Sequence, residues 1–332
     1  MKAIRQYEFG GPEQLQFEER PDPEPGSGQI RVAVAAAGVH LIDTTIRRGV
    51  QTGAFPLPVL PITPGREVAG AVDAIGPDVD ESWLGRRVVV HLGLASGGYA
   101  SSAVANVADL FPLADHVDAA AAVAMVGTGR TALGILEATE LTSDDVVLVT
   151  AAAGGVGALL IQAANSVGAT VVGVAGGRAK IDTVTRLGAH IAIDSSVGEW
   201  APEPWSGRVR AALGGRAVTV ALDGVGGDTG RAAFELVAPG GRMVVFGWAS
   251  GAPMRLSVDD LMARGVRFTP GIGSRVMARR GGIRGLSADA LDALTTGHLT
   301  PLVHPPFPLA DAADAHRAIE ARATIGKVVL VP

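Results

Sequence analysis

Two patterns of apolar residues divide the chain. Up to about residue 120, short apolar runs alternate with turns rich in proline and glycine, which predicts strands at residues 29–37, 67–75 and 86–91. From Val146 onward, apolar runs alternate regularly with helical stretches, and they predict strands at residues 146–150, 171–175, 191–194, 218–223, 243–247 and 266–268. Such alternation is typical of an α/β fold with a doubly wound parallel sheet.

The alternation stops after about residue 270. Helices are predicted at residues 288–296 and 309–321, and a strand at residues 327–331. That last strand must pair with another strand, and the N-terminal β region offers one. We therefore expect a β-rich domain built from residues 1–122 and 271–332, with an α/β domain of residues 123–270 inserted between them.

Composition narrows the classes of function. The chain has 332 residues and a formal net charge of -5, which argues against a nucleic-acid groove or an anionic membrane surface as partner. It has no Cys, which excludes disulfides, iron–sulfur clusters, thiolate zinc sites and a cysteine nucleophile. No secretory leader is visible, and glycines interrupt the uncharged stretch at 146–177. We expect a cytoplasmic protein with small-molecule partners and no membrane segment.

A glycine-rich turn follows the first strand of the α/β region. The G-x-G-x-x-G positions fall on Ala152, Gly154 and Gly157, and Gly155 and Val156 lie between them where a helix begins. Small residues there allow a pyrophosphate to approach the backbone, and the helix N-terminus offers N–H groups to the anion. The strand–turn–helix context indicates a dinucleotide site. The alternative is a turn selected only for tight packing.

The residues at the end of the second strand distinguish an NADH site from an NADPH site. An NAD site usually has an acidic residue there, whereas this chain has Ala175 followed by Gly176, Arg178 and Lys180. A small residue followed by two cations leaves room for a 2′-phosphate and neutralises it. The pattern favours NADPH. Alternatively, Arg178 and Lys180 are solvated residues in the first turn of the next helix.

Several motifs resemble the zinc-independent quinone oxidoreductases of the medium-chain dehydrogenase/reductase superfamily. They extend over nearly the whole chain and comprise Met1-Lys2-Ala3-Ile4, Ala37-Gly38-Val39-His40-Leu41-Ile42-Asp43, Pro64-Gly65-Arg66-Glu67-Val68-Ala69-Gly70, the turn at 151–157, Phe246-Gly247 and Gly326-Lys327-Val328-Val329-Leu330. The resemblance implies a GroES-like catalytic domain, a Rossmann domain, NADPH in the cleft between them, and a homodimer formed edge to edge through the Rossmann sheets.

The resemblance also bears on metals. Zinc-dependent relatives have Cys where His40 stands and His where Arg66 stands, and they add a four-Cys lobe. A guanidinium at the second position would repel a divalent cation, so we expect no metal. His40 and Glu67 could still bind a metal, but two ligands are few for such a site.

Without zinc, the oxyanion that develops during hydride transfer must be stabilised by hydrogen-bond donors. The resemblance places His40 at the cleft, where it could donate to a carbonyl or supply a proton, or else serve only to fix a loop. Asp43 is expected to orient a neighbour and Thr131 to lie by the nicotinamide. Phe246 and Gly247 end the fifth strand, at the edge of the sheet where ligands bind.

Two departures from the family fall where substrate would lie. Quinone reductases usually have Asn in place of His40, and Tyr where this chain has Gln51 or Phe55. We expect an NADPH-dependent reductase of quinones or related α,β-unsaturated carbonyls. The alternatives are a zinc-free enoyl-thioester reductase and a crystallin-like protein that binds NADPH without turnover.

Overall fold

The computed structural model describes residues 1–51, 56–93, 96–196, 203–273, 276, 278–279 and 281–332. The chain divides into two compact units, one formed by Met1–Thr128 with Ser287–Pro332 and the other by Gly129–Leu286. The sequence placed these boundaries after residues 122 and 270. Residues 271–286 therefore lie with the α/β unit, and the second boundary falls inside a helix, α10 (Gly282–Thr295).

The first unit is built on an antiparallel sheet. Its strand order is β14-β15-β3-β4-β5-β7, with β6 also paired to β3, and β1 and β2 form a separate hairpin. The strands are β1 (Lys2–Arg5), β2 (Gln16–Glu19), β3 (Gln29–Val39), β4 (Glu67–Ile75), β5 (Arg87–His91), β6 (Ser102–Asn106), β7 (Phe111–Pro112), β14 (Phe307–Pro308) and β15 (Val328–Val331). The helical segments are η1 (Pro12–Gln14), α1 (Leu41–Arg47), η2 (Glu81–Trp83), η3 (Val107–Asp109), α2 (Ala119–Val123), η5 (Leu309–Asp311) and α11 (Ala312–Glu320).

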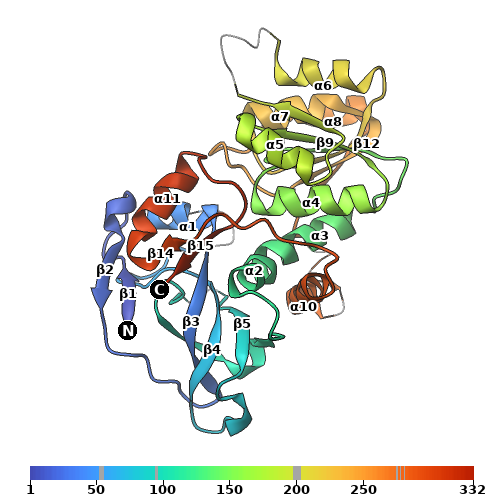
Figure 1. Cartoon of the computed structure of the whole chain (residues 1–332). Coiled ribbons are helices and arrows are strands. Elements are labelled where there is room, and N and C mark those ends of the chain that lie inside the picture. The colour runs from blue at the N-terminus through green and yellow to red at the C-terminus, as the bar shows by residue number, and fades with distance from the viewer. Residues whose placement is uncertain (52–55, 94–95, 197–202, 274–275, 277, 280) are drawn as a thin grey trace. The chain divides into compact units, whose positions relative to one another are not determined.

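The last strand pairs with the N-terminal region, as the sequence predicted. Val328 of β15 lies opposite Val39 of β3 in an antiparallel ladder. Figure 1 shows the red β15 beside the blue β3, so the two ends of the chain share one sheet. This pairing brings residue 327 close to residues 38–40, at the end of β3.

The burial of β3 changes along its length. Its first residues alternate between buried and less buried positions, as expected of a strand with one face toward the core, whereas its last four residues are all buried. Helix α2 packs on this part of the strand and on β4. The chain leaves β3 from a fully covered position, so side chains at that end are placed in a protein interior.

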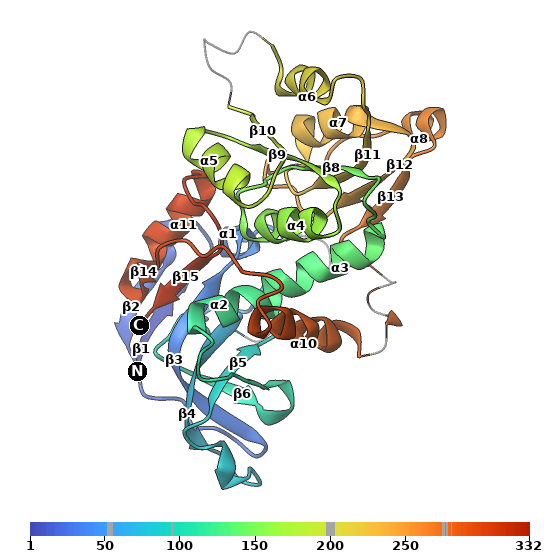
Figure 2. The same cartoon turned by 45° about the vertical axis from the view of Figure 1, so that its right-hand side comes forward.

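The second unit is a six-stranded parallel sheet with the order β10-β9-β8-β11-β12-β13. This order is that of a doubly wound dinucleotide-binding fold, and it confirms the predicted fold class. The strands are β8 (Val146–Val149), β9 (Thr170–Ala175), β10 (Ile191–Asp194), β11 (Val218–Asp223), β12 (Val237–Val245) and β13 (Arg267–Pro270). Helices α3 and α4 lie on one face, and α6 and α7 on the other (Figures 1 and 2).

The helices of this unit are α3 (Arg130–Thr139), α4 (Gly155–Ser166), α5 (Arg178–Arg186), α6 (Trp205–Leu213), α7 (Gly227–Leu236) and α8 (Val258–Arg264). Central strand β8 is buried at every position, which explains its uninterrupted apolar run. The strand expected at 243–247 starts earlier in the structure, because its pairing with β11 begins at Val237. It ends at Val245. Phe246 and Gly247 follow it instead of ending it.

A π-helical turn, η4 (Ala124–Gly129), joins α2 to α3. Together they give one helical stretch, Ala119–Thr139, that is long and apolar enough to cross a membrane, with 61% of its most apolar window buried inside the protein. A buried helix of a protein core has the same length and composition, so this stretch is weak evidence for a membrane segment.

Candidate active site

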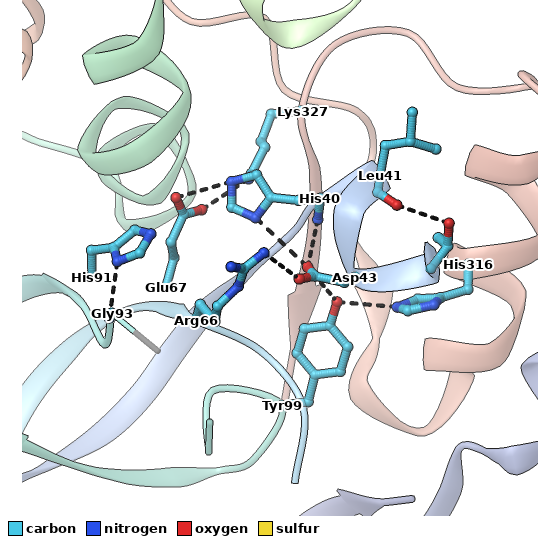
Figure 3. A network of polar contacts seen from close by, with 11 residues as sticks. His40, Leu41, Asp43, Arg66, Glu67, His91, Gly93, Tyr99, His316 and Lys327 are labelled. Carbon is cyan, nitrogen blue, oxygen red and sulfur yellow. Dashed lines mark hydrogen bonds and ion pairs between the residues drawn. The ribbon is translucent and has the colours of Figure 1, made fainter. Parts of the chain in front are cut away.

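Asp43 is the centre of a buried polar network at the end of β3. It lies in the first turn of α1, where its Oδ2 accepts a hydrogen bond from the backbone N–H of His40 at 2.8 Å. The same oxygen accepts from the Tyr99 hydroxyl at 3.2 Å, and Oδ1 accepts from Arg66 at 3.1 Å (Figure 3). Burial alone would raise the pKa of Asp43, but His40 and Arg66 hold it well below its usual range. Asp43 is therefore an anion that fixes three neighbours.

A second cluster joins His40 to two residues from other strands. Lys327 Nζ lies 2.8 Å from His40 Nε2 and 2.8 Å from Glu67 Oε2, and His40 Nε2 lies 3.1 Å from Glu67 Oε1. Glu67 begins β4, and Lys327 immediately precedes β15. The side chains of Glu67 and Lys327 are 0% and 3% exposed. A buried ion pair from opposite ends of the chain thus holds the imidazole.

The charges of this cluster follow from its neighbours. Lys327 Nζ and Glu67 Oε1 both approach Nε2 of His40, and the buried Nδ1 lies 3.6 Å from Asp43 Oδ2. Burial lowers the pKa of Lys327, and Glu67 opposes that shift. Despite burial, His40 and Lys327 keep the pKa of Glu67 below its usual range. Both ring nitrogens of His40 therefore face protein groups.

Two glycines make room for Glu67. A Cβ on Gly127 would overlap Oε1 of Glu67, and a Cβ on Gly38 would overlap Oε2. Gly38 belongs to β3, and Gly127 to the π-helical turn η4. Such turns are frequent at functional sites. The carboxylate is thus enclosed by backbone, which explains why it is fully buried.

A further chain of hydrogen bonds reaches Asp43 from α11. Arg47 donates to Nδ1 of His316 at 3.2 Å, and His316 Nε2 lies 3.1 Å from the Tyr99 hydroxyl. Burial lowers the pKa of His316 to about 4, so the ring is neutral near pH 7. A neutral ring that accepts at Nδ1 must donate at Nε2, and Tyr99 then donates to Asp43. The direction of every bond in this chain is determined by Arg47.

A cavity of about 120 Å³ opens beside Asp43. Its polar lining includes Gln6, Arg47 and Arg66. The apolar part of its lining comes from Ile46, Pro56, Leu57, Pro58, Ile62 and Pro64. Apolar walls with a few polar groups are characteristic of small-molecule sites. Gln51 is exposed, and Phe55 lies outside the described residues.

The predicted dinucleotide turn has the expected form in the second unit. Helix α4 begins directly after it, at Gly155, with Val156 and Gly157 in its first turn. A Cβ on Gly157 would overlap the carbonyl oxygen of Ala151, and Ala152 is fully buried. Gly154 also lies close to the Ala151 oxygen. Small residues are therefore required for the helix to start this close to β8, and its N–H groups suit a pyrophosphate.

The end of β9 has no acidic side chain, as the sequence indicated. Gly176 and Gly177 lead into α5, and the side chain of Arg178 is 90% exposed with Asp182 as its ion-pair partner. Lys180 lies in the first turn of the same helix. A carboxylate does approach from the neighbouring strand, because Asp194 accepts hydrogen bonds from the N–H groups of Gly177 and Ser196 at 2.8 Å each. Asp194 thus stabilises the loop before α5.

The remaining predicted residues lie at the carboxyl edge of the same sheet or on α3. Phe246 directly follows β12, and its N–H donates to the carbonyl of Asp223 at 2.8 Å. Its ring packs on Gly224, where a Cβ would overlap it. Thr131 lies in the first turn of α3. These residues belong to the second unit, whereas His40 and Asp43 belong to the first.

Among the residues that the structure describes, no group of three His, Cys, Asp or Glu side chains could hold a metal ion. His40 and Glu67 do approach each other, but Lys327 Nζ contacts both of them. The cation at this position is an ammonium group of the protein itself.

Comparisons with known proteins agree with this architecture. Residues 26–115 match the alcohol dehydrogenase GroES-like domain, and residues 155–288 match the zinc-binding dehydrogenase family. A quinone oxidoreductase of Pseudomonas aeruginosa is 32% identical, over 100% of this chain and 99% of the relative. The chain belongs to the quinone oxidoreductase branch of the medium-chain dehydrogenase/reductase superfamily.

Two other relatives of this branch are informative about ligands. A 2-haloacrylate reductase of a Burkholderia species is 34% identical over 98% of this chain and 97% of the relative. The crystal structure of Escherichia coli quinone oxidoreductase complexed with NADPH superposes with a TM-score of 0.87 at 30% identity, with 100% of both chains covered. The same fold therefore serves reductases that are named for different substrates.

Most of the network around His40 and Asp43 is not predictable from the sequence pattern. The sequence indicates Glu67 only as a possible metal ligand and Lys327 only as part of a family motif, and nothing in it marks Tyr99 or His316 as functional. A charged residue next to an apolar strand was the available signal for Glu67 and Lys327, since such a residue is buried only with a partner.

Proposed function

We propose that this protein is an NADPH-dependent reductase of quinones or other α,β-unsaturated carbonyls. The observation that carries this proposal is the turn between β8 and α4, where Gly154 and Gly157 bring a helix N-terminus close to the end of a central strand. Bound NADPH supplies a hydride, and Gly154, Gly155 and Val156 would hold its pyrophosphate. Ala152 and Gly157 keep strand and helix close together.

The proposed preference for NADPH rests on the start of α5. Gly176 leaves space at the end of β9, and the exposed guanidinium of Arg178 and the ammonium of Lys180 would neutralise a 2′-phosphate. Phe246 and Gly247 follow β12 at the carboxyl edge of the same sheet, where they would line the cofactor site.

The proposed chemistry uses no zinc. Lys327 contacts the two side chains, His40 and Glu67, that a metal would need. Among the proposed catalytic residues, Asp43 orients His40 and Arg66, and Thr131 lies by the nicotinamide. His40 supplies a proton in this scheme, for which its ring must turn away from Lys327. We further propose a cytoplasmic homodimer.

The experiment is steady-state oxidation of NADPH with quinones, enones and crotonyl-type thioesters in parallel. Reduction of quinones or enones supports the proposal, whereas a strong preference for thioesters identifies an enoyl-thioester reductase. Tight NADPH binding without oxidation in the presence of any of them identifies a non-catalytic protein. His40→Ala should lower kcat more than cofactor affinity, and an unchanged kcat would make His40 a structural residue.

A further inference from the structure

We propose that Asp194 enables this protein to bind NADH as well as NADPH, because its carboxylate accepts a hydrogen bond from the 2′-hydroxyl of the adenosine ribose of NADH. This inference rests on the proposed function and makes its range of cofactors more specific. It comes from the position of Asp194 at the end of β10, beside the end of β9, where NAD sites usually have an acidic residue.

The register of the sheet places Asp194 next to the end of β9. Asp194 lies opposite Ala175, the last residue of β9, in the parallel ladder of β9 and β10 (Figure 2). The N–H of Ser195 then donates to the carbonyl of Ala175 at 2.8 Å, so the pairing continues to the end of both strands. Neighbouring strands are about 4.8 Å apart. The end of β9 itself has no acidic side chain, but one lies on the adjacent strand.

The carboxylate of Asp194 lies against the loop between β9 and α5. Its Oδ1 accepts a hydrogen bond from the N–H of Gly177 at 2.8 Å. The same oxygen accepts from the N–H and the hydroxyl of Ser196, at 2.8 and 2.6 Å. Gly177 immediately precedes α5, so the carboxylate is at the carboxyl edge of the sheet, where dinucleotides bind.

The second oxygen of Asp194 is available to a ligand. Within the described part of the chain, every hydrogen bond to this carboxylate goes to Oδ1. Arg208 donates to the backbone carbonyl of Asp194, at 2.5 Å, and not to its carboxylate. Oδ2 can therefore accept a hydrogen bond from a ribose hydroxyl.

Two glycines leave space beside this carboxylate. Gly177 has a φ of 94°, which favours glycine, and among the described residues a Cβ there would meet no atom within 4 Å. A Cβ on Gly176 would come no closer than 3.8 Å to the Ser195 hydroxyl. The loop therefore has room for the ribose of a dinucleotide.

The charge of Asp194 acts in opposite directions on the two dinucleotides. Burial would raise the pKa of Asp194, but hydrogen bonds from Gly177 and Ser196 hold it below its ordinary value. Asp194 is therefore an anion near pH 7. An anion accepts strongly from the 2′-hydroxyl of NADH, whereas it repels the 2′-phosphate of NADPH. Asp194 thus reduces the preference for NADPH that the cations of α5 provide.

The test measures the Kd of each dinucleotide by calorimetric titration of the wild-type protein and Asp194→Asn. The asparagine oxygen can still accept the N–H of Gly177, but it has no charge. Asp145→Asn is the matched control. Its carboxylate accepts the N–H of Thr142 at 2.9 Å, and it lies just before β8, at the opposite, amino edge of the same sheet.

We expect the wild-type protein to bind both dinucleotides. Asp194→Asn should bind NADPH about threefold more tightly and NADH about threefold more weakly, so that the ratio of the two Kd values changes about tenfold. Asp194→Ser, which also lacks the charge, should change the ratio in the same direction. Asp145→Asn should leave the ratio unchanged. Thermal unfolding of each variant verifies that it is folded.

Two results would overturn the inference: a wild-type protein that binds NADPH but not NADH, or an equal change for both dinucleotides in Asp194→Asn. The second result would restrict Asp194 to holding the loop before α5. If Asp194→Asn does not fold, Asp194→Ser decides. A wild-type protein that binds neither dinucleotide would overturn the proposed function together with this inference. Binding of both with the expected change of ratio, but without oxidation of either, would support the inference and contradict only the proposed turnover.

Discussion

Lys327 stabilises a carboxylate in the interior of the first unit. Its ammonium lies 2.8 Å from Glu67, whose side chain is 0% exposed and enclosed by Gly38 and Gly127. A buried ion pair gives little net stability relative to an apolar pair, but the loss of one partner leaves an uncompensated charge. Removal of either partner should therefore destabilise the fold far more than the intact pair stabilises it.

We predict that Lys327→Met lowers the free energy of unfolding by about 3–5 kcal/mol, because Glu67 stays buried without its cation. The double variant Lys327→Met/Glu67→Gln should recover much of this loss. Urea unfolding at pH 7 measures both. Arg317→Met is the control, since its ion pair with Asp314 is more than half exposed and should contribute less than about 1 kcal/mol. A loss in Lys327→Met as small as in the control would contradict the prediction.

His316 gives the network a specific dependence on pH. Its pKa is about 4 in the folded protein, against an ordinary value of 6.5. Between these values the unfolded chain binds more protons than the folded protein, so stability falls as pH decreases from 6.5 to 4. Asp43 and Glu67 have lowered pKa values, and their contribution is lost at still lower pH, below the ordinary values of 3.8 and 4.5.

We predict that His316→Gln removes about 3 kcal/mol of this acid-induced loss. A glutamine amide can accept from Arg47 and donate to Tyr99, but it does not titrate. The measurement is the free energy of unfolding at several pH values from 7 to 4, compared as a slope. The wild-type curve should be steeper than that of the variant. Parallel curves would show that His316 does not titrate in the folded protein as its burial implies.

At the scale of elements, the start of α4 depends on the absence of side chains. The helix begins one residue after Gly154, and a Cβ on Gly157 would overlap the carbonyl oxygen of Ala151. That oxygen belongs to the backbone and cannot turn away as a side chain would. A larger residue must therefore move the helix relative to β8.

We predict that Gly157→Ala lowers the free energy of unfolding by about 1–3 kcal/mol, as expected of an overpacked core position. It should also weaken NADPH binding, because the helix N-terminus moves. Gly134→Ala in α3 is the control, since a Cβ there would make only ordinary contacts, at 3.4 Å. Calorimetric titration with NADPH and thermal unfolding give the two readouts. Tight NADPH binding by Gly157→Ala would mean that the turn does not hold the pyrophosphate.

At the scale of the whole molecule, ligand binding to one unit should stabilise the folded chain. A ligand that binds only the native state at 100 times its Kd adds about 2.7 kcal/mol to the free energy of unfolding. If Lys180 neutralises the 2′-phosphate, NADPH should stabilise the protein far more than NADH does at equal concentration.

We predict that Lys180→Ala weakens NADPH binding at least tenfold, which reduces the stabilisation to about 1.4 kcal/mol at the same NADPH concentration. NADH, which has no 2′-phosphate, should stabilise the variant and the wild type equally. Thermal unfolding with each dinucleotide measures this difference. Equal losses with NADPH and NADH would show that Lys180 does not contact the 2′-phosphate.

The sequence alone determined the fold class and most of the strands. Strands β4, β10 and β11 have the predicted bounds, because their apolar runs end at turns or polar residues that the sequence displays. The glycine turn was also evident, since strand, turn and helix are consecutive. These features depend on residues near one another in the chain, so periodicity and turn chemistry suffice to predict them.

Only the tertiary structure decided the environment of His40. Glu67 and Lys327 reach it through the pairing of β3 with β4 on one side and with β15 on the other, and His316 reaches Asp43 through Tyr99. No local spacing encodes such contacts, because they depend on which strands become neighbours. Burial then selected the protonation states, since charges removed from water persist only beside partners.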